Sequence, residues 1–351
     1  MQKKYPKYCI IAALAGLLSA CTATDGADGT SQTLNMTLDG VVGVQSRAAS
    51  DIQDAAFQTG EDVRIWVWDA GVLGTATGTY AYTNESQTDI QYKVAYVDES
   101  STLIPADQIA FRFPTVDSDK KEKKVNIRAC YPAREKYTNA TDINLVNLRT
   151  IPTTFTIQTD QSTAEGYKAS DLMYGLPTNG NPVKNTNSLV GMTFRHTMAK
   201  VVINITAGQG IDDLTGIDVT LDCVLTASVK TNTTSYDMVV EPSGGATGTV
   251  KMNSADQVSG KKQVTMAAVV PPQEIAHEHP FITIKRGDVS YVYRPTTNIT
   301  FLSCSLNTFY ITVEEYRLIV SGSITPWNTG SGDEFLLTGT IYEVTAREEN
   351  P

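Results

Sequence analysis

The sequence predicts an all-β protein, and two observations carry this prediction. Apolar and polar residues alternate with a period of two along most of the chain, as in strands with one buried and one solvated face. Groups of Asn, Gly, Pro and Asp separate these runs, and helical periodicity is brief where it occurs. A chain of 351 residues is long enough for two domains of ordinary size. We therefore expect two tandem β-sandwiches.

The expected strands follow one another from residue 33 onward. The first has Leu34, Met36 and Leu38 on one face and polar residues on the other. The later runs lie at residues 65–68, 124–129, 200–205, 219–225, 281–285, 310–313 and 318–324. The Asn-rich residues 179–188 are the expected boundary, which predicts one domain at 48–185 and a second at 186–351.

The N-terminal residues have the three zones of a secretory signal. Lysines at positions 3, 4 and 7 precede an apolar run, and the sequence Leu-Ser-Ala-Cys that ends at Cys21 fits a lipobox. We interpret residues 1–21 as a lipoprotein signal peptide and Cys21 as the lipid-attachment (palmitate) site. The alternative is a plain signal peptide with a chance cysteine. The apolar run is shorter than the about 20 residues that a membrane-spanning helix needs.

Composition argues against several functions. The net charge of −10, with 28 basic residues, argues against nucleic acid as a partner. Cys130, Cys223 and Cys304 lack C-x-x-C spacing, so we expect free thiols. His277 and His279 lack the i, i+4 spacing of a zinc helix, and a solvated loop is the favoured interpretation over a weak metal site. No Gly-x-Ser-x-Gly or dinucleotide motif is present, so we predict a non-enzyme without cofactor or metal. An envelope hydrolase with a dispersed site is a third, unsupported interpretation.

Several local motifs, in this order and spacing, resemble those of the fimbrillin family, the subunits of type V pili. They are Ala-Cys-Tyr-Pro at 129–132, Asp-Leu-Met-Tyr at 171–174, Phe-Arg-His-Thr-Met-Ala-Lys-Val at 194–201, and the closing strands at 309–313 and 324–328. Cys130 stands where the family often has an aromatic residue. The resemblance spans residues 60–327 and implies sandwiches of the transthyretin-like, Greek-key type. His196, within the third motif, is expected to be a core histidine bonded to backbone.

The resemblance also implies a maturation route. Fimbrillins similar to this chain reach the surface as lipoproteins, and an arginine-specific protease then removes the N-terminal segment with its first strand. In this chain the implied cleavage follows Arg47 and leaves Ala48 as the new terminus, so residues 22–47, the tether and first strand, would be a propeptide. Leu34, Met36 and Leu38 would belong to the displaced strand. Small, polar neighbours of Arg47 suit an exposed scissile loop, although an ordinary loop arginine is the alternative.

The chain continues after Trp327 with one more alternating run, in which Phe335, Leu337 and Ile341 share a face. Such a strand can complete an open sheet edge on another subunit, or it can pack within its own domain. We predict a fimbrial stalk subunit that polymerises by donor-strand exchange for adhesion at the outer membrane and in an extracellular fimbrium. The implied partners are other pilin subunits, the arginine-specific protease and a transient outer-membrane lipid anchor.

The runner-up interpretation is a surface lipoprotein that binds glycans or host protein, as a tip adhesin would. Trp66 and Trp68 alternate on an expected strand and are the first candidates for stacking on sugar rings. Packing against a neighbouring strand or domain is the more common use of such residues.

Overall fold

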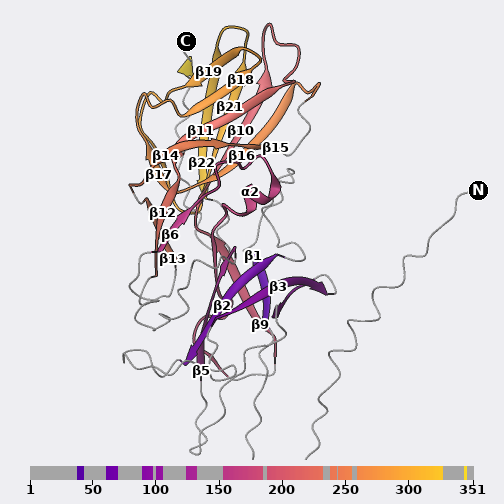
Figure 1. The fold of residues 1–351 in the computed structure, drawn as a ribbon, viewed down its shortest axis with the longest axis vertical. Coiled ribbons are helices and arrows are strands. Elements are labelled where there is room, and N and C mark those ends of the chain that lie inside the picture. The colour runs from indigo at the N-terminus through magenta and orange to yellow at the C-terminus, as the bar shows by residue number, and fades with distance from the viewer. Residues whose placement is uncertain are drawn as a thin grey trace, which may run out of the picture. The chain divides into compact units, whose positions relative to one another are not determined.

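The computed structural model describes residues 38–42, 61–69, 89–97, 100–105, 124–132, 153–184, 188–231, 238–242, 244–254, 259–326 and 344–345. These residues are almost entirely β-strands, and the short helix α2 (Ala164–Lys168) interrupts them (Figure 1). The predicted all-β class is therefore confirmed. Among the described residues, no helix is both long and apolar enough to cross a membrane.

Eight strands form the first sheet. They are β1 (Leu38–Val42), β2 (Asp62–Asp69), β3 (Asp89–Val97), β4 (Ser100–Pro105), β5 (Lys124–Tyr131), β7 (Met173–Pro177), β8 (Val183–Lys184) and β9 (Val190–His196). Neighbours pair in the order β2-β3-β4-β1-β9-β7-β5-β8, and β2 also pairs with β5. The pairing of β2 with β5 closes a ring of the first seven strands in this order, in which β1 pairs with β4 and β9, and β8 lies outside the ring. A closed ring removes the unpaired edges that an open sheet exposes.

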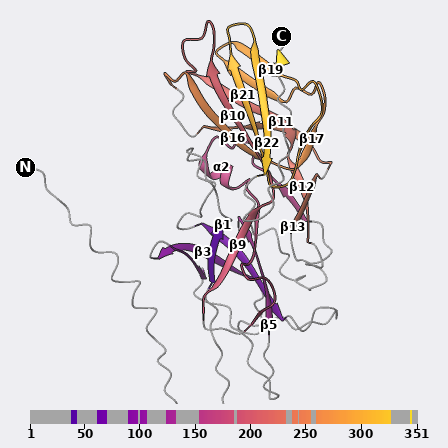
Figure 2. The same cartoon turned by 180° about the vertical axis from the view of Figure 1, so that it is seen from behind.

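Two further sheets pack face to face. The six-stranded sheet has the order β15 (Asn253–Ser254), β16 (Gln263–Val270), β10 (Ala199–Ala207), β21 (Ser305–Val313), β22 (Leu318–Pro326) and β23 (Val344–Thr345) (Figure 2). The four-stranded sheet has the order β14 (Thr247–Lys251), β11 (Ile217–Val224), β18 (Ile282–Arg286) and β19 (Val289–Tyr293). Smaller sheets join β13 (Met238–Pro242), β12 (Thr226–Thr231) and β6 (Thr153–Thr156), and β17 (Gln273–Ile275) with β20 (Ile299–Phe301).

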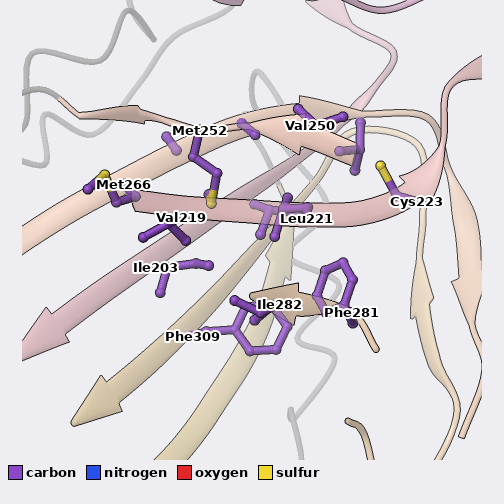
Figure 3. Packing of buried hydrophobic residues seen from close by; sticks show 14 of the residues in the cluster. Ile203, Val219, Leu221, Cys223, Val250, Met252, Met266, Phe281, Ile282 and Phe309 are labelled. Carbon is purple, nitrogen blue, oxygen red and sulfur yellow. The ribbon is translucent and has the colours of Figure 1, made fainter. Parts of the chain in front are cut away.

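The core between these two sheets is made by the alternate residues that the sequence pattern marks as apolar. Ile203 of β10 and Phe309 of β21 face Leu221 of β11 and Ile282 of β18 (Figure 3). The ring of Phe309 also contacts that of Phe281, with centroids 5.8 Å apart and tilted planes. Such tilted contacts between aromatic rings add to the gain from burial, and they hold the two sheets in one relative position.

Two separate hydrophobic clusters lie within the compact unit of residues 33–351. The smaller cluster fills the ring of β1 to β9, and the larger fills the sandwich. The chain enters the larger cluster with Phe155 and Tyr167, returns to the smaller one at Met173, and passes back to the larger one at Met198. Core packing therefore crosses residue 185, and the division into domains 48–185 and 186–351 stays a prediction.

The burial of one face of β5 differs from what the sequence predicts. The sequence pattern predicts Asn126 and Arg128 on a solvated face, but both side chains are buried, as is Cys130. Because β5 pairs with β2 on one side and with β7 and β8 on the other, it lies inside the sheet. Alternation of polar and apolar residues distinguishes the two faces of a strand but does not reveal whether other segments cover the second face.

Side-chain amides replace strand partners at two places. Gln161 accepts from Val269 N and donates to Val269 O of β16, both at 2.8 Å. Asn181 likewise accepts from Ile127 N at 2.8 Å and donates to Ile127 O of β5 at 2.9 Å. An amide carries the same donor and acceptor as a peptide group, so it satisfies a strand edge at the point where no further strand follows.

Replacing Gln161 with Leu should lower the free energy of unfolding by about 2–4 kcal/mol, because the N–H and C=O of Val269 stay buried without partners. Urea unfolding followed by circular dichroism measures the change. The matched control is Gln158→Leu, since the side chain of Gln158 is exposed and the expected effect is within about 0.5 kcal/mol. Equal effects of the two substitutions would contradict the role of the Gln161 amide.

Candidate functional site

The strand β1 is held on both sides by strands that come from distant parts of the chain. It pairs antiparallel with β4, where Leu38 lies opposite Leu103 and Asp39 opposite Thr102. On its other side it pairs parallel with β9 along all five residues, from Leu38 opposite Val190 to Val42 opposite Phe194. Without β1, the facing edges of β4 and β9 would lack these partners. This place in the ring is our candidate functional site, and we call it the β1 position.

Leu38 fixes β1 in this position through its side chain. It is 0% exposed and belongs to the smaller cluster with Leu103, Val190 and Phe194. Burying a leucine is worth about 1.5–3 kcal/mol, so a strand placed here needs an apolar residue at this point. Of the residues predicted for the first strand, Leu38 is the one that the structure describes. Leu34 and Met36 lie outside the described residues.

The neighbouring strand β9 packs closely against β7. A Cβ atom on Gly175 of β7 would lie 2.9 Å from the ring of Phe194, so glycine leaves room for that ring next to the β1 position. The main chain after β9 is then fixed by Thr197, whose N–H and hydroxyl both donate to Leu172 O at 2.9 and 2.7 Å. Because these contacts hold β9 in place, its edge toward β1 keeps one conformation for pairing with a strand.

His196 ends β9 and forms a buried pair with a carboxylate. Its Nδ1 lies 2.8 Å from Asp171 Oδ1, and both side chains are buried. The residue is buried as predicted, and the structure shows a carboxylate as a partner of its ring. Asp171 and His196 come from two of the motifs quoted above, and the fold joins them across β7 and β9.

A second polar link lies at the start of β2. Glu61 accepts from Tyr131 OH at 3.3 Å and lies 2.8 Å from Lys168 Nζ of α2. Burial, with a further contribution from Glu61, raises the pKa of the Tyr131 phenol well above its usual value. The phenol therefore stays protonated and acts as a hydrogen-bond donor, which makes this link structural.

Cys130, Cys223 and Cys304, which we expected to be free thiols, form no disulfide in the structure. Burial raises the pKa of the Cys223 thiol to about 12 and that of Cys304 to about 11. Since the thiolate is the reactive form, neither residue has the character of a nucleophile or redox centre.

Each histidine of the loop at 277–279 lies next to a carboxylate. His279 Nε2 lies 3.0 Å from Asp222 Oδ1, and His277 Nε2 lies 3.3 Å from Glu278 Oε1. Among the described residues, no group of three or more His, Cys, Asp or Glu side chains could hold a metal ion.

Most of the other predicted site residues are not among the described residues. Cys21, Arg47, Ala48, Phe335, Leu337 and Ile341 lie outside the described residues, so their roles stay predictions. Trp66 and Trp68 lie on β2, opposite Arg128 and Asn126 of β5, and their glycan role is likewise a prediction. Near the C-terminus, β23 pairs with β22 at Val344 opposite Val320.

Sequence reasoning missed the two strands that flank β1. It identified no strand at 100–105, and it treated residues 194–201 only as a motif. The alternation of Val190, Met192 and Phe194 was a usable signal for β9, and all three are buried. For β4, the short run Thr-Leu-Ile before Pro105 was the only local sign.

A family model described as fimbrillin-like matches residues 46–327. The chain therefore belongs to the fimbrillin-like family, whose members are structural fimbrial subunits, and the resemblance inferred from the motifs is confirmed. A comparison with curated protein sequences finds no significant match.

Similar solved structures come from species of Bacteroides and Porphyromonas. A candidate cell adhesion protein of Bacteroides ovatus is 16% identical, with a TM-score of 0.54, and one of Bacteroides uniformis is 18% identical, with a TM-score of 0.53. Each match covers 86% of this chain and 100% of the other. The tip fimbrial protein Mfa3 of Porphyromonas gingivalis, with a C-terminal truncation, is 12% identical over 83% of this chain and 100% of its own, with a TM-score of 0.46.

Proposed function

We propose that this protein is a fimbrial stalk subunit that is exported as a lipoprotein, cleaved after Arg47 and polymerised by donor-strand exchange. The observation that carries the proposal is the β1 position, where an N-terminal strand closes the ring between β4 and β9. A strand in this place can be replaced by a strand from another subunit, because its neighbours offer main-chain partners to any extended segment.

The position of Arg47 in the chain supports this order of events. The strand β1 ends at Val42 and β2 begins at Asp62, so Arg47 lies in the connection between them. Cleavage after Arg47 would separate β1 from the rest of the protein, and non-covalent contacts, among them the pairing with β4 and β9 and the burial of Leu38, would then retain it. The lipid on Cys21 would leave with the same segment, which makes it a transient outer-membrane anchor.

Burial of apolar side chains supplies part of the free energy that holds a strand in the β1 position. The described part of β1 buries the side chain of Leu38, worth about 1.5–3 kcal/mol. A donor strand that buries Phe335, Leu337 and Ile341 would gain about that amount for each residue. Ordering a flexible segment costs about 1–2 kcal/mol per residue, so the hydrogen bonds to β4 and β9 must contribute as well. These hydrogen bonds stabilise an inserted strand because they pair backbone groups that an open sheet edge leaves without partners.

Replacing Arg47 with Ala should prevent maturation and therefore polymerisation, because β1 stays covalently attached. In cells that express this variant, N-terminal sequencing and intact mass of the surface protein should find no chain that begins at Ala48. Electron microscopy should find no filaments.

The matched control for this variant is Arg317→Ala, which removes a half-exposed arginine from the tip of the β21–β22 hairpin. It should mature and polymerise as the unchanged protein does. Filaments of normal length from Arg47→Ala would rule out cleavage at this residue as the licensing step.

Deletion of residues 335–351 should leave a folded monomer that is cleaved but forms no filaments, because the donor strand is missing. The melting temperature and the electron micrographs of the cleaved protein provide the two measurements. Deletion of residues 346–351 is the control, since it keeps Phe335, Leu337 and Ile341 and should still allow assembly. A stalk role fails if the longer deletion assembles as well.

A further inference from the structure

The six-stranded sheet has an outer face opposite the sandwich core. On β10 and β21 the core-facing residues Ile203, Ile205, Phe309 and Ile311 are buried, and the residues between them point the other way. One end of this outer face is covered, because Lys200 and Val269 are buried there and Gln161 bonds to Val269. At the opposite end Tyr310 is exposed, and Asn204 and Thr312 are partly exposed.

Tyr310 stands in the open part of this face. It is 53% exposed on β21, one of the inner strands of the sheet. In register, Asn204 of β10 lies on one side of it and Ser321 of β22 on the other. A large aromatic residue that is half exposed in the middle of a sheet face leaves a ring surface without a protein partner along its outer side.

The side chains around this ring are uncharged, and most of them are polar, although Val202 and Ile319 are apolar members of the same face. We call Tyr310 and the polar residues beside it the Tyr310 face, namely Asn204, Thr265, Thr308, Tyr310, Thr312 and Ser321. Solvated strand faces commonly carry Lys and Glu, which keep sheets from associating. At the hairpin tip, Arg317 Nε is paired with Glu314 Oε2 at 2.6 Å.

The face is also rigid. Three of its six residues are threonines, whose branched side chains have few rotamers in a strand. Thr265 Oγ1 donates to Asn204 Oδ1 at 2.9 Å, which fixes the Asn204 amide and leaves its N–H donors for a ligand. Donors and acceptors held in place in this way bind with a small loss of entropy.

This chemistry matches a sugar better than a protein. A sugar ring offers an apolar face for stacking on Tyr310 and hydroxyls for the surrounding Asn, Ser and Thr groups. Adjacent strands lie about 4.8 Å apart, so side chains from two or three strands reach one ring. A stable protein interface takes roughly 20–30 residues on each side, which is several times more than this face supplies.

We propose that the Tyr310 face binds a neutral oligosaccharide. Anionic sugars are disfavoured because the face has no unpaired cation for a carboxylate or sulfate. A single site of this kind is shallow and weak. In a polymer the site repeats along the filament, so binding to a glycan-covered surface gains from multivalency. This inference adds a ligand to a protein proposed above as a structural subunit, and it uses different residues from Trp66 and Trp68.

The test is binding of the purified protein to a printed array of neutral and sialylated oligosaccharides, followed by titration calorimetry with the neutral sugar that is best retained. We expect retention of neutral sugars. Tyr310→Ala should weaken the titrated affinity by about tenfold or more, because the stacking surface is lost. Tyr310→Phe keeps the ring and should stay within about threefold. Ser321→Arg should block the face without removing the ring.

Tyr316→Ala is the matched control. Tyr316 is 69% exposed at the tip of the same hairpin but lies outside the Tyr310 face, so its loss should leave sugar binding unchanged. Melting temperatures confirm that each variant is folded. Retention of sialylated sugars alone, no retention of neutral sugars, or unchanged binding by Tyr310→Ala would each overturn the inference. A changed oligomer size in Tyr310→Ala without sugar binding would assign the face to protein contacts and overturn it too.

Filament assembly keeps the two proposals separable. Tyr310→Ala should polymerise as the unchanged protein does, since the Tyr310 face and the β1 position lie in different sheets. A protein that binds sugar but never forms filaments would contradict the stalk role alone.

Discussion

The closure of the N-terminal ring depends on the backbone pairing of β1 with β4 and β9. Neither neighbour can replace β1 for the other, because β4 and β9 each use their second edge for β3 and β7. Backbone groups that lie at a buried edge need partners, so an unfilled β1 position is costly. That requirement can be met by any extended segment with an apolar residue at the place of Leu38, whether it comes from this chain or from another copy.

The core of the sandwich does not depend on β1. The sandwich of β10 to β22 has its own core and does not use β1, so loss of the strand leaves that cluster intact. The edge of β9 is fixed by Gly175, Thr197 and the buried pair of His196 with Asp171. Elsewhere, side-chain amides satisfy strand edges without adding strands. In the proposed exchange, one strand position changes its occupant while these contacts hold the strands around it.

Much of this fold could be predicted from local alternation, since Val201, Ile203 and Ile205 lie on the core side as expected. Partners distant in sequence could not. The parallel pairing of Leu38 with Val190 and the side-chain contact of His196 with Asp171 each join segments that are distant in the sequence. Local periodicity does not show which distant segments meet. The burial of Asn126 and Arg128 was missed for the same reason. In the candidate site, the alternation predicted Leu38 as an inward residue of the first strand. The position of β4 and β9 on either side of that strand became known only from the structure.

A disulfide between β1 and β4 tests the central claim most directly. Leu38 and Leu103 are opposite one another in the antiparallel pair, a spacing that suits a disulfide, so Leu38→Cys with Leu103→Cys should lock β1 in place. After cleavage, filament growth followed by light scattering should be absent in the oxidised protein and should appear when a reductant is added. The single variant Leu103→Cys should assemble in both conditions. Filaments of equal length from the oxidised, locked protein would contradict strand exchange at the β1 position.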